Sequence, residues 1–188
     1  HDLCVVASHW TSKLRQRDGS NGEEGRKKYA ALIADVFAAA ASRDPAVDFL
    51  VCGDFNDTPE SEPVARALRA TGDRGELLAD PRRPKLLALL AGKEPRRFGT
   101  IWYDGEPLIY DHICVSAGLL DGAGWSCDPN TLTVPTDGLT QAGATRREPW
   151  RFGSLGSEPK GGRGYSDHFP VTVRLKVEGG ATAPPAAE

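Results

Sequence analysis

The chain has 188 residues, of which 39% are hydrophobic and 26% charged, and these values are ordinary for one soluble globular domain. The formal net charge of −3 offers no bulk positive charge for sequence-independent binding of nucleic acid. No apolar run in the sequence approaches the length of a membrane span.

The first half of the chain predicts two strands with a helix between them. Residues 2–8 form a short, β-branched apolar run that is typical of a strand buried on both faces. The polar, Gly-containing stretch 11–28 predicts a surface loop, and residues 26–41 then predict a helix with one apolar stripe. Residues 47–55 predict a second buried strand. The stripe residues are Tyr29, Leu32, Ile33, Val36, Phe37 and Ala40.

The second half predicts short helices and further strands. Residues 61–71 begin like a helix, with Ser61 as its cap and Pro63 in its first turn, and residues 85–91 predict a short helix. This order of elements favours an α/β (α+β) fold with a mixed sheet. Strands are expected at 108–116, 131–134 and 169–177, the last half-exposed because its residues alternate, and the Ala- and Pro-rich tail 178–188 is expected to be disordered.

The chain contains four cysteines: Cys4, Cys52, Cys114 and Cys127. The first three lie in apolar, strand-like runs, which predicts buried thiols, with a disulfide as the alternative. Cysteine usage therefore leaves the cellular compartment open.

Polar side chains stand at the ends of four predicted strands. Carboxylate and amide oxygens are ligands that Mg²⁺, Mn²⁺ and Ca²⁺ prefer, whereas zinc favours Cys and His. If the four strand ends meet at one edge of the sheet, they form a divalent-cation site with histidines beside it. The strand-end residues are His9, then Asp54 and Asn56, then Asp111 and His112, and finally Asp167 and His168.

Each strand end also has a simpler explanation. Asp54 and Asn56 could form an Asx turn, Asp111 and His112 a surface pair, and Asp167 could cap a strand. Four such ends with complementary chemistry are hard to obtain from turns alone, so the set as a whole favours a functional site.

Four segments, in order along the chain, carry a resemblance: SHWTSK, GDFNDTP, YDHICVS and YSDHFPV. Together they resemble the motifs of the endonuclease/exonuclease/phosphatase superfamily, over about residues 3 to 177. The resemblance implies one domain over residues 1–177, with a four-layer β-sandwich flanked by helices. It also implies a divalent-metal-dependent phosphoric-ester hydrolase, with a nuclease that cleaves phosphodiester bonds as the first hypothesis.

The resemblance assigns roles to the strand-end residues. Asp54, Asn56 and Asp167 would hold the metal, which is Mg²⁺ or else Mn²⁺ or Ca²⁺, and Asp54 would also orient the attacking water. His168, oriented by Asp111, would contact the phosphate or act as a base, and His9 would be a second catalytic imidazole. His112 would have a structural role.

The chain resembles mainly the C-terminal half of such a domain. The half that normally supplies an Asn and a metal-binding Glu has no counterpart in residues 1–188. We therefore expect a truncation, or a second chain that supplies the missing half, and weak activity from the isolated chain. The alternative functions are a lipid phosphodiesterase, a phosphatase, or a non-catalytic binding module.

The stretch 137–165 is Gly-rich and basic, with aromatic residues among the cations. It predicts a substrate-binding loop for a nucleic acid or another phosphodiester, and the alternative is a solvated flexible insertion. The predicted substrate-binding residues are Arg146, Arg147, Trp150 and Arg151.

Overall fold

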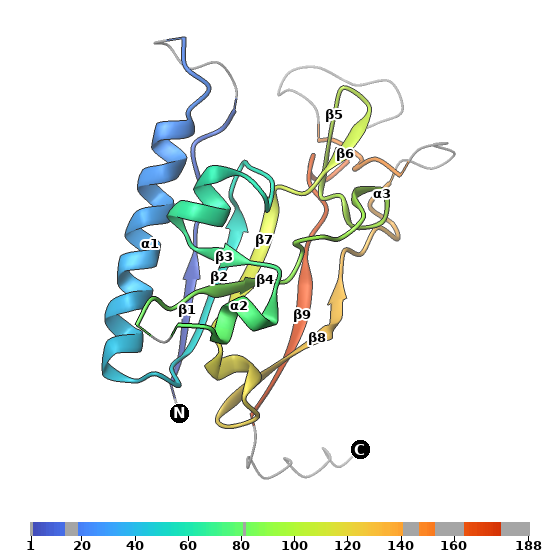
Figure 1. Cartoon of the computed structure of the whole chain (residues 1–188). Coiled ribbons are helices and arrows are strands. Elements are labelled where there is room, and N and C mark those ends of the chain that lie inside the picture. The colour runs from blue at the N-terminus through green and yellow to red at the C-terminus, as the bar shows by residue number, and fades with distance from the viewer. Residues whose placement is uncertain (1, 14–18, 81, 141–146, 153–163, 178–188) are drawn as a thin grey trace, which may run out of the picture.

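A five-stranded sheet with the order β1-β2-β7-β4-β3 forms the middle of the computed structural model, which describes residues 2–13, 19–80, 82–140, 147–152 and 164–177 (Figure 1). β1 is parallel to β2 and β3 to β4, whereas β7 is antiparallel to both β2 and β4. The expected mixed sheet is therefore confirmed. Its strands are β1 (Leu3–Ala7), β2 (Asp48–Asp54), β3 (Ala70–Thr71), β4 (Leu86–Ala88) and β7 (Asp111–Val115).

Other elements cover the two faces and one end of this sheet (Figure 1). Helix α1 (Glu23–Arg43) lies on one face, and the antiparallel pair β8 (Trp125–Thr133) and β9 (Thr172–Val177) lies on the other. The hairpin β5 (Ile101–Tyr103) and β6 (Glu106–Leu108) stands at one end of the molecule. The short helices are η1 (Glu62–Ala67), α2 (Arg74–Leu78), α3 (Pro95–Phe98) and η2 (Gly118–Leu120).

Alternation along β2 divides the core into two apolar clusters. Phe49 and Val51 point to the α1 side, while Leu50 points to the β8–β9 side, because successive side chains of a strand face opposite ways. The described residues therefore form three layers: helix, five-stranded sheet and two-stranded sheet.

Helix α1 is longer than predicted, and it is rotated relative to the prediction. The expected stripe residues Ile33 and Phe37 are buried, but Tyr29, Leu32 and Val36 are exposed. The buried face instead begins at Arg26, which is 1% exposed and bonds to Asp57 below the end of β2. This polar contact fixes the rotation of the helix, which hydrophobic spacing alone does not reveal.

Strand β1 and its cysteine are less buried than predicted. Val5 is 54% exposed, because β1 is the edge strand of the sheet and the described residues leave its face at Val5 open. Cys4 and Cys52 lie on the neighbouring strands β1 and β2, and both are partly exposed rather than buried, whereas Cys114 is buried as predicted. All four cysteines are free thiols.

The prediction of a helix at residues 85–91 is wrong. Leu86–Ala88 is the fully buried strand β4, paired with β3 and β7. A short apolar run cannot be assigned to helix or strand from its periodicity, and here the neighbouring strands decide.

Three other predicted elements have shifted boundaries. The helix predicted at 61–71 is the π-helical η1, with Pro63 in its first turn and no side-chain cap from Ser61. The strand predicted at 131–134 is the end of the longer β8, and the one predicted at 108–116 is divided between β6 and β7.

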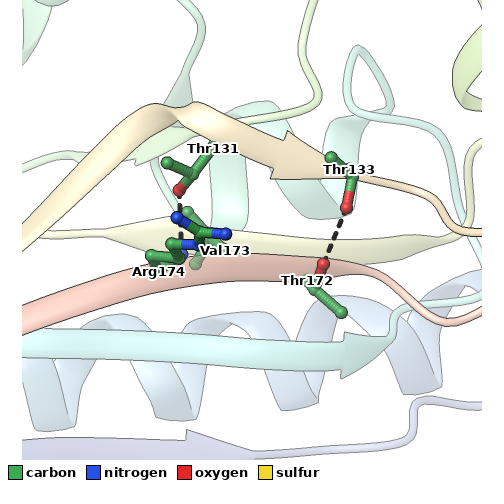
Figure 2. A pocket seen from close by; sticks show the side chains of 5 residues that line it. All are labelled: Thr131, Thr133, Thr172, Val173 and Arg174. Carbon is green, nitrogen blue, oxygen red and sulfur yellow. Dashed lines mark hydrogen bonds between the residues drawn. The ribbon is translucent and has the colours of Figure 1, made fainter.

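A hollow opens on the β8–β9 pair where its register shifts between Asp128 and Thr133 (Figure 2). Side chains replace ladder bonds here: the Thr133 and Thr172 hydroxyls lie 2.8 Å apart, and Thr131 Oγ1 accepts from the Arg174 N–H at 2.9 Å. The hollow is lined by Thr131, Thr133, Thr172, Val173 and Arg174.

Among the described residues, no helix combines the length and the apolar content needed to cross a membrane. The tail 178–188 lies outside the described residues.

Candidate active site

The end of β2 requires glycine before its acidic residue. Gly53 has φ +132°, and a Cβ there would collide with the Ser8 carbonyl oxygen. The chain beyond β1 can therefore follow β2 closely, with the Trp10 N–H donating to the Asp54 carbonyl at 2.9 Å. This approach brings His9 beside Asp54.

The turn after β2 holds the Asp54 carboxylate in place. Asn56 adopts φ +51°, a conformation that asparagine tolerates, and its N–H donates to Asp54 Oδ1 at 2.7 Å. The Asn56 amide nitrogen donates to Asp54 Oδ2 and to the Trp10 carbonyl, each at 3.1 Å. The Asx turn considered as the simpler explanation is therefore present, and it also orients the carboxylate.

Asp54, Asp111 and His168 converge beside this turn. Asp111 opens β7 and is the cross-strand partner of Asp54, and His168 precedes β9. His168 Nδ1 lies 2.6 Å from Asp111 Oδ2, and its Nε2 lies 3.8 Å from Asp54 Oδ2. One ligand atom from each of the three residues lies within 4.8 Å of the others.

His9 approaches the same carboxylate from the β1 side. Its Nε2 lies 3.5 Å from Asp54 Oδ2, and its side chain is 73% exposed. Asp54, Asp111 and His168 are each about one-fifth exposed, so solvent reaches the group, and the more exposed His9 lies at its rim.

Asp167 does not belong to the group of three. Its carboxylate lies 4.0 Å from Arg151 Nη1, and both side chains are 55% exposed. Arg151 also donates to the Trp102 carbonyl at 2.7 Å, so it links the hairpin β5–β6 to the segment that carries Asp167 and His168.

The other predicted substrate-binding residues lie differently. Arg147 is only partly exposed, and its guanidinium bonds to the backbone carbonyls of Val134 and Arg97, which makes it a link between loops. The Trp150 ring packs edge-on against Tyr165, with 6.2 Å between centroids. Arg146 lies outside the described residues.

Burial and neighbouring charges shift the two central titrating groups. Burial raises the pKa of Asp54, a hydrogen bond from the Asn56 N–H lowers it, and the charge of Asp111 raises it further. Burial lowers the pKa of His168, but the hydrogen bond and the charge of Asp111 outweigh this, so the net shift is upward.

The pKa of His168, followed by NMR titration of its ring protons, should lie above its ordinary value of 6.5. In Asp111→Asn it should fall clearly, because the raising contributions of Asp111 disappear while the effect of burial remains. Because the folded-state pKa is raised, the imidazolium stabilises the fold below the unfolded pKa, and this contribution is lost as the pH rises through the folded pKa. An unchanged pKa in Asp111→Asn would contradict the assigned cause.

Sequence reasoning missed a buried ionic network under the site. Asp57, 5% exposed, accepts from Arg26 Nε at 2.8 Å and pairs with Lys13 at 2.7 Å. The signal was the position of Arg26 four and seven residues before the buried Ala30 and Ile33, on the inner face of the helix.

His112 has the structural surroundings that were expected. It is 1% exposed and stacks on Phe55, which in turn stacks on Trp10, with 4.8 Å and 4.1 Å between centroids. Its Nε2 bonds to the Asp57 carbonyl at 2.8 Å, and burial lowers its pKa, which favours the neutral imidazole.

The sequence profile of the Endonuclease/Exonuclease/phosphatase family matches residues 1–177. The chain belongs to this family. A search of curated proteins finds no match.

Solved structures with a similar fold include truncated TDP2 of Caenorhabditis elegans, with 15% identity, a TM-score of 0.49, and coverage of 89% of this chain and 51% of that one. Another is the mannosyl-6-phosphatase Bt3783 of Bacteroides thetaiotaomicron VPI-5482, with 18% identity, a TM-score of 0.44, and coverage of 82% and 47%. This chain thus spans about half the length of these structures.

Proposed function

We propose that the chain carries the catalytic edge of a divalent-metal-dependent phosphodiesterase, with nucleic acid as its substrate. The observation that supports this most is the convergence of Asp54, Asp111 and His168, with His9 at the rim. These residues come from four segments far apart in the sequence, and the chain belongs to a family of phosphoric-ester hydrolases.

The donor chemistry fits a hard divalent ion on the Asp54 side of the site. The 2.6 Å contact of His168 Nδ1 with Asp111 Oδ2 is a hydrogen bond, and an ion between these two atoms would break it. Asp54 would therefore provide the carboxylate ligand, and Asn56, whose amide nitrogen bonds to Asp54 and to the Trp10 carbonyl, would offer its amide oxygen. Asp167 would complete the set through water, since it stands outside the group.

A bound ion would offset the negative charge that a phosphodiester gains on the way to its transition state. The protein groups divide the remaining work. Asp111 fixes the tautomer of His168, so that Nε2 is the atom that exchanges a proton or contacts the phosphate. Asp54 orients the attacking water, and His9, exposed at the rim, donates to the phosphate or the leaving group.

Substrate binding beyond the phosphate is assigned to Arg151 and Trp150. The Arg151 side chain is half-exposed, and its guanidinium faces Asp167, the residue before His168. Trp150, the residue before Arg151, packs against Tyr165, and the Tyr165 N–H donates to the Trp150 carbonyl. Tyr165 is exposed, whereas Trp150 is partly buried. A cation beside an exposed aromatic ring suits a strand of nucleic acid, with its phosphate on the cation and a base on the ring.

The test is hydrolysis of bis(p-nitrophenyl) phosphate and of DNA, measured on the 188-residue chain and on the longest natural protein that contains it. We expect turnover with Mg²⁺ or Mn²⁺ from the longer protein and weak turnover from the 188-residue chain, with loss in EDTA and recovery when excess metal is added. Hydrolysis that EDTA leaves unchanged would contradict the metal-dependent mechanism. Turnover of p-nitrophenyl phosphate alone would point to a phosphatase instead.

The same assay addresses the nucleic-acid assignment. Arg151→Ala should raise KM for DNA by about tenfold and change KM for the small diester little, because only DNA reaches beyond the reacting phosphate. Equal effects on both substrates would contradict a role in binding the extended substrate.

A further inference from the structure

Thr100 bonds to three segments: the end of the β5–β6 hairpin, the start of β7 with Asp111, and the segment that carries His168. It follows α3 and has no exposed surface. Its N–H donates to the Leu108 carbonyl at 2.8 Å, at the end of the hairpin. Its own carbonyl accepts from the N–H of Phe169 at 2.7 Å, the residue after His168.

The hydroxyl of Thr100 bonds to the segment that carries Asp111. Thr100 Oγ1 accepts from the N–H groups of Tyr110 and Asp111 at 3.1 Å and 3.2 Å, where the chain enters β7. A hydroxyl oxygen has two acceptor lone pairs, so one side chain can satisfy both of these partly buried donors. The bridge between Ile101 and His168 adds a second link on the β9 side.

Thr100 therefore contacts the backbone on both sides of the short hydrogen bond between His168 and Asp111. The Asp111 N–H donates to the Thr100 hydroxyl. The N–H of Phe169, next to His168, donates to the Thr100 carbonyl, and His168 itself forms a β-bridge with Ile101. The 2.6 Å hydrogen bond between His168 Nδ1 and Asp111 Oδ2 therefore joins two segments whose backbones both bond to Thr100.

We infer that Thr100 is a positioning residue of this site: its hydroxyl sets the placement of Asp111 against His168. Its effect on turnover rests on the proposed function, while its effect on the His168–Asp111 hydrogen bond does not. Thr100→Val keeps the shape of the side chain but removes the acceptor, which leaves two partly buried N–H groups without this partner. Asp111 should then move, and small displacements of reacting groups are expensive in rate.

The first measurement is independent of activity. In ¹H NMR spectra of protein with ¹⁵N-labelled histidine, the Nδ1 proton of His168 should give a downfield resonance, assigned by its loss in His168→Ala. Thr100→Val should lose this resonance or shift it upfield, whereas Thr100→Ser, which keeps the hydroxyl, should retain it. The matched control is Thr131→Val, which removes another hydroxyl that accepts a backbone N–H, that of Arg174 on the β8–β9 pair (Figure 2). It should leave the resonance unchanged.

The second measurement is turnover. Thr100→Val should lower kcat by about ten- to a hundredfold with KM within about twofold, and Thr100→Ser should recover most of the loss. A folded Thr100→Val with wild-type resonance and wild-type kcat would overturn the inference. If the resonance responds but the longest natural protein that contains the chain is inactive even with Mg²⁺ or Mn²⁺, the positioning stands and the proposed function fails.

If Thr100→Val does not fold, amide exchange in the wild-type protein replaces it. The N–H groups of Tyr110, Asp111 and Phe169 should be protected from exchange, and Thr100→Ser should preserve this protection. Rapid exchange of these three amides would overturn the inference, because the bonds on which it rests would then be absent.

Discussion

Replacing His168 with alanine should lower kcat for the phosphodiester by about a hundred- to ten-thousandfold while the protein stays folded. The imidazole lies between Asp111 and Asp54, and alanine leaves no group at that point to exchange a proton or to contact the phosphate. Asp54→Ala should have a loss of at least this size, because it removes both the carboxylate ligand and the group that orients the water. Steady-state kinetics with saturating Mn²⁺, with circular dichroism as the fold check, measures both.

The control for these variants is Asp35→Asn, an exposed carboxylate on α1 that lies outside the site. It should keep wild-type kcat and KM. Wild-type turnover from a folded His168→Ala protein would disprove the proposed mechanism.

The largest loss of stability is expected from Arg26→Met. Arg26 is buried and donates to Asp57 at 2.8 Å, to the Asn21 carbonyl at 2.8 Å and to the Thr11 carbonyl at 3.1 Å. Methionine fills similar space but leaves the buried carboxylate with Lys13 as its remaining ionic partner. Removing one partner of a buried pair costs about 3–5 kcal/mol in the free energy of unfolding, which urea denaturation measures.

Two comparisons make this test specific. Lys27→Met, next along the same helix, removes ion pairs to Glu23, Glu24 and Glu62 at the surface and should change stability far less. Adding Asp57→Asn to Arg26→Met should cost less than the sum of the two single changes, because the pair is then removed as a unit. Additive losses would show that Arg26 and Asp57 act independently.

The network also bears on the site. The Asp57 carbonyl bonds to the His112 ring, and the Asp57 carboxylate accepts from the Thr58 N–H. These bonds stabilise the turn that follows Asp54. We therefore expect Arg26→Met to reduce activity as well as stability, although Arg26 lies away from the reacting groups.

The sequence by itself determined the family and the mixed sheet, and it predicted most of the residues that lie together at one edge of that sheet. Asp54 at the end of β2 could be predicted because apolar runs mark strands and polar residues directly beside them mark strand ends. Asp111 was expected within a strand at 108–116, and only the structure places it at the start of β7. His168 and His9 followed from the same reasoning. Their convergence was conditional at that stage, because strand order is a long-range property that spacing does not contain.

The tertiary structure alone decided which contacts these residues make. It separated Asp167, which faces Arg151, from the group of Asp54, Asp111 and His168. It turned residues 86–88 into a strand because two neighbours pair with them, and it rotated α1 so that Arg26 reaches Asp57. The physical reason is the same in each case: hydrogen bonds and ion pairs between distant segments depend on side-chain geometry at the 3 Å scale, whereas hydrophobic periodicity records only which residues avoid water.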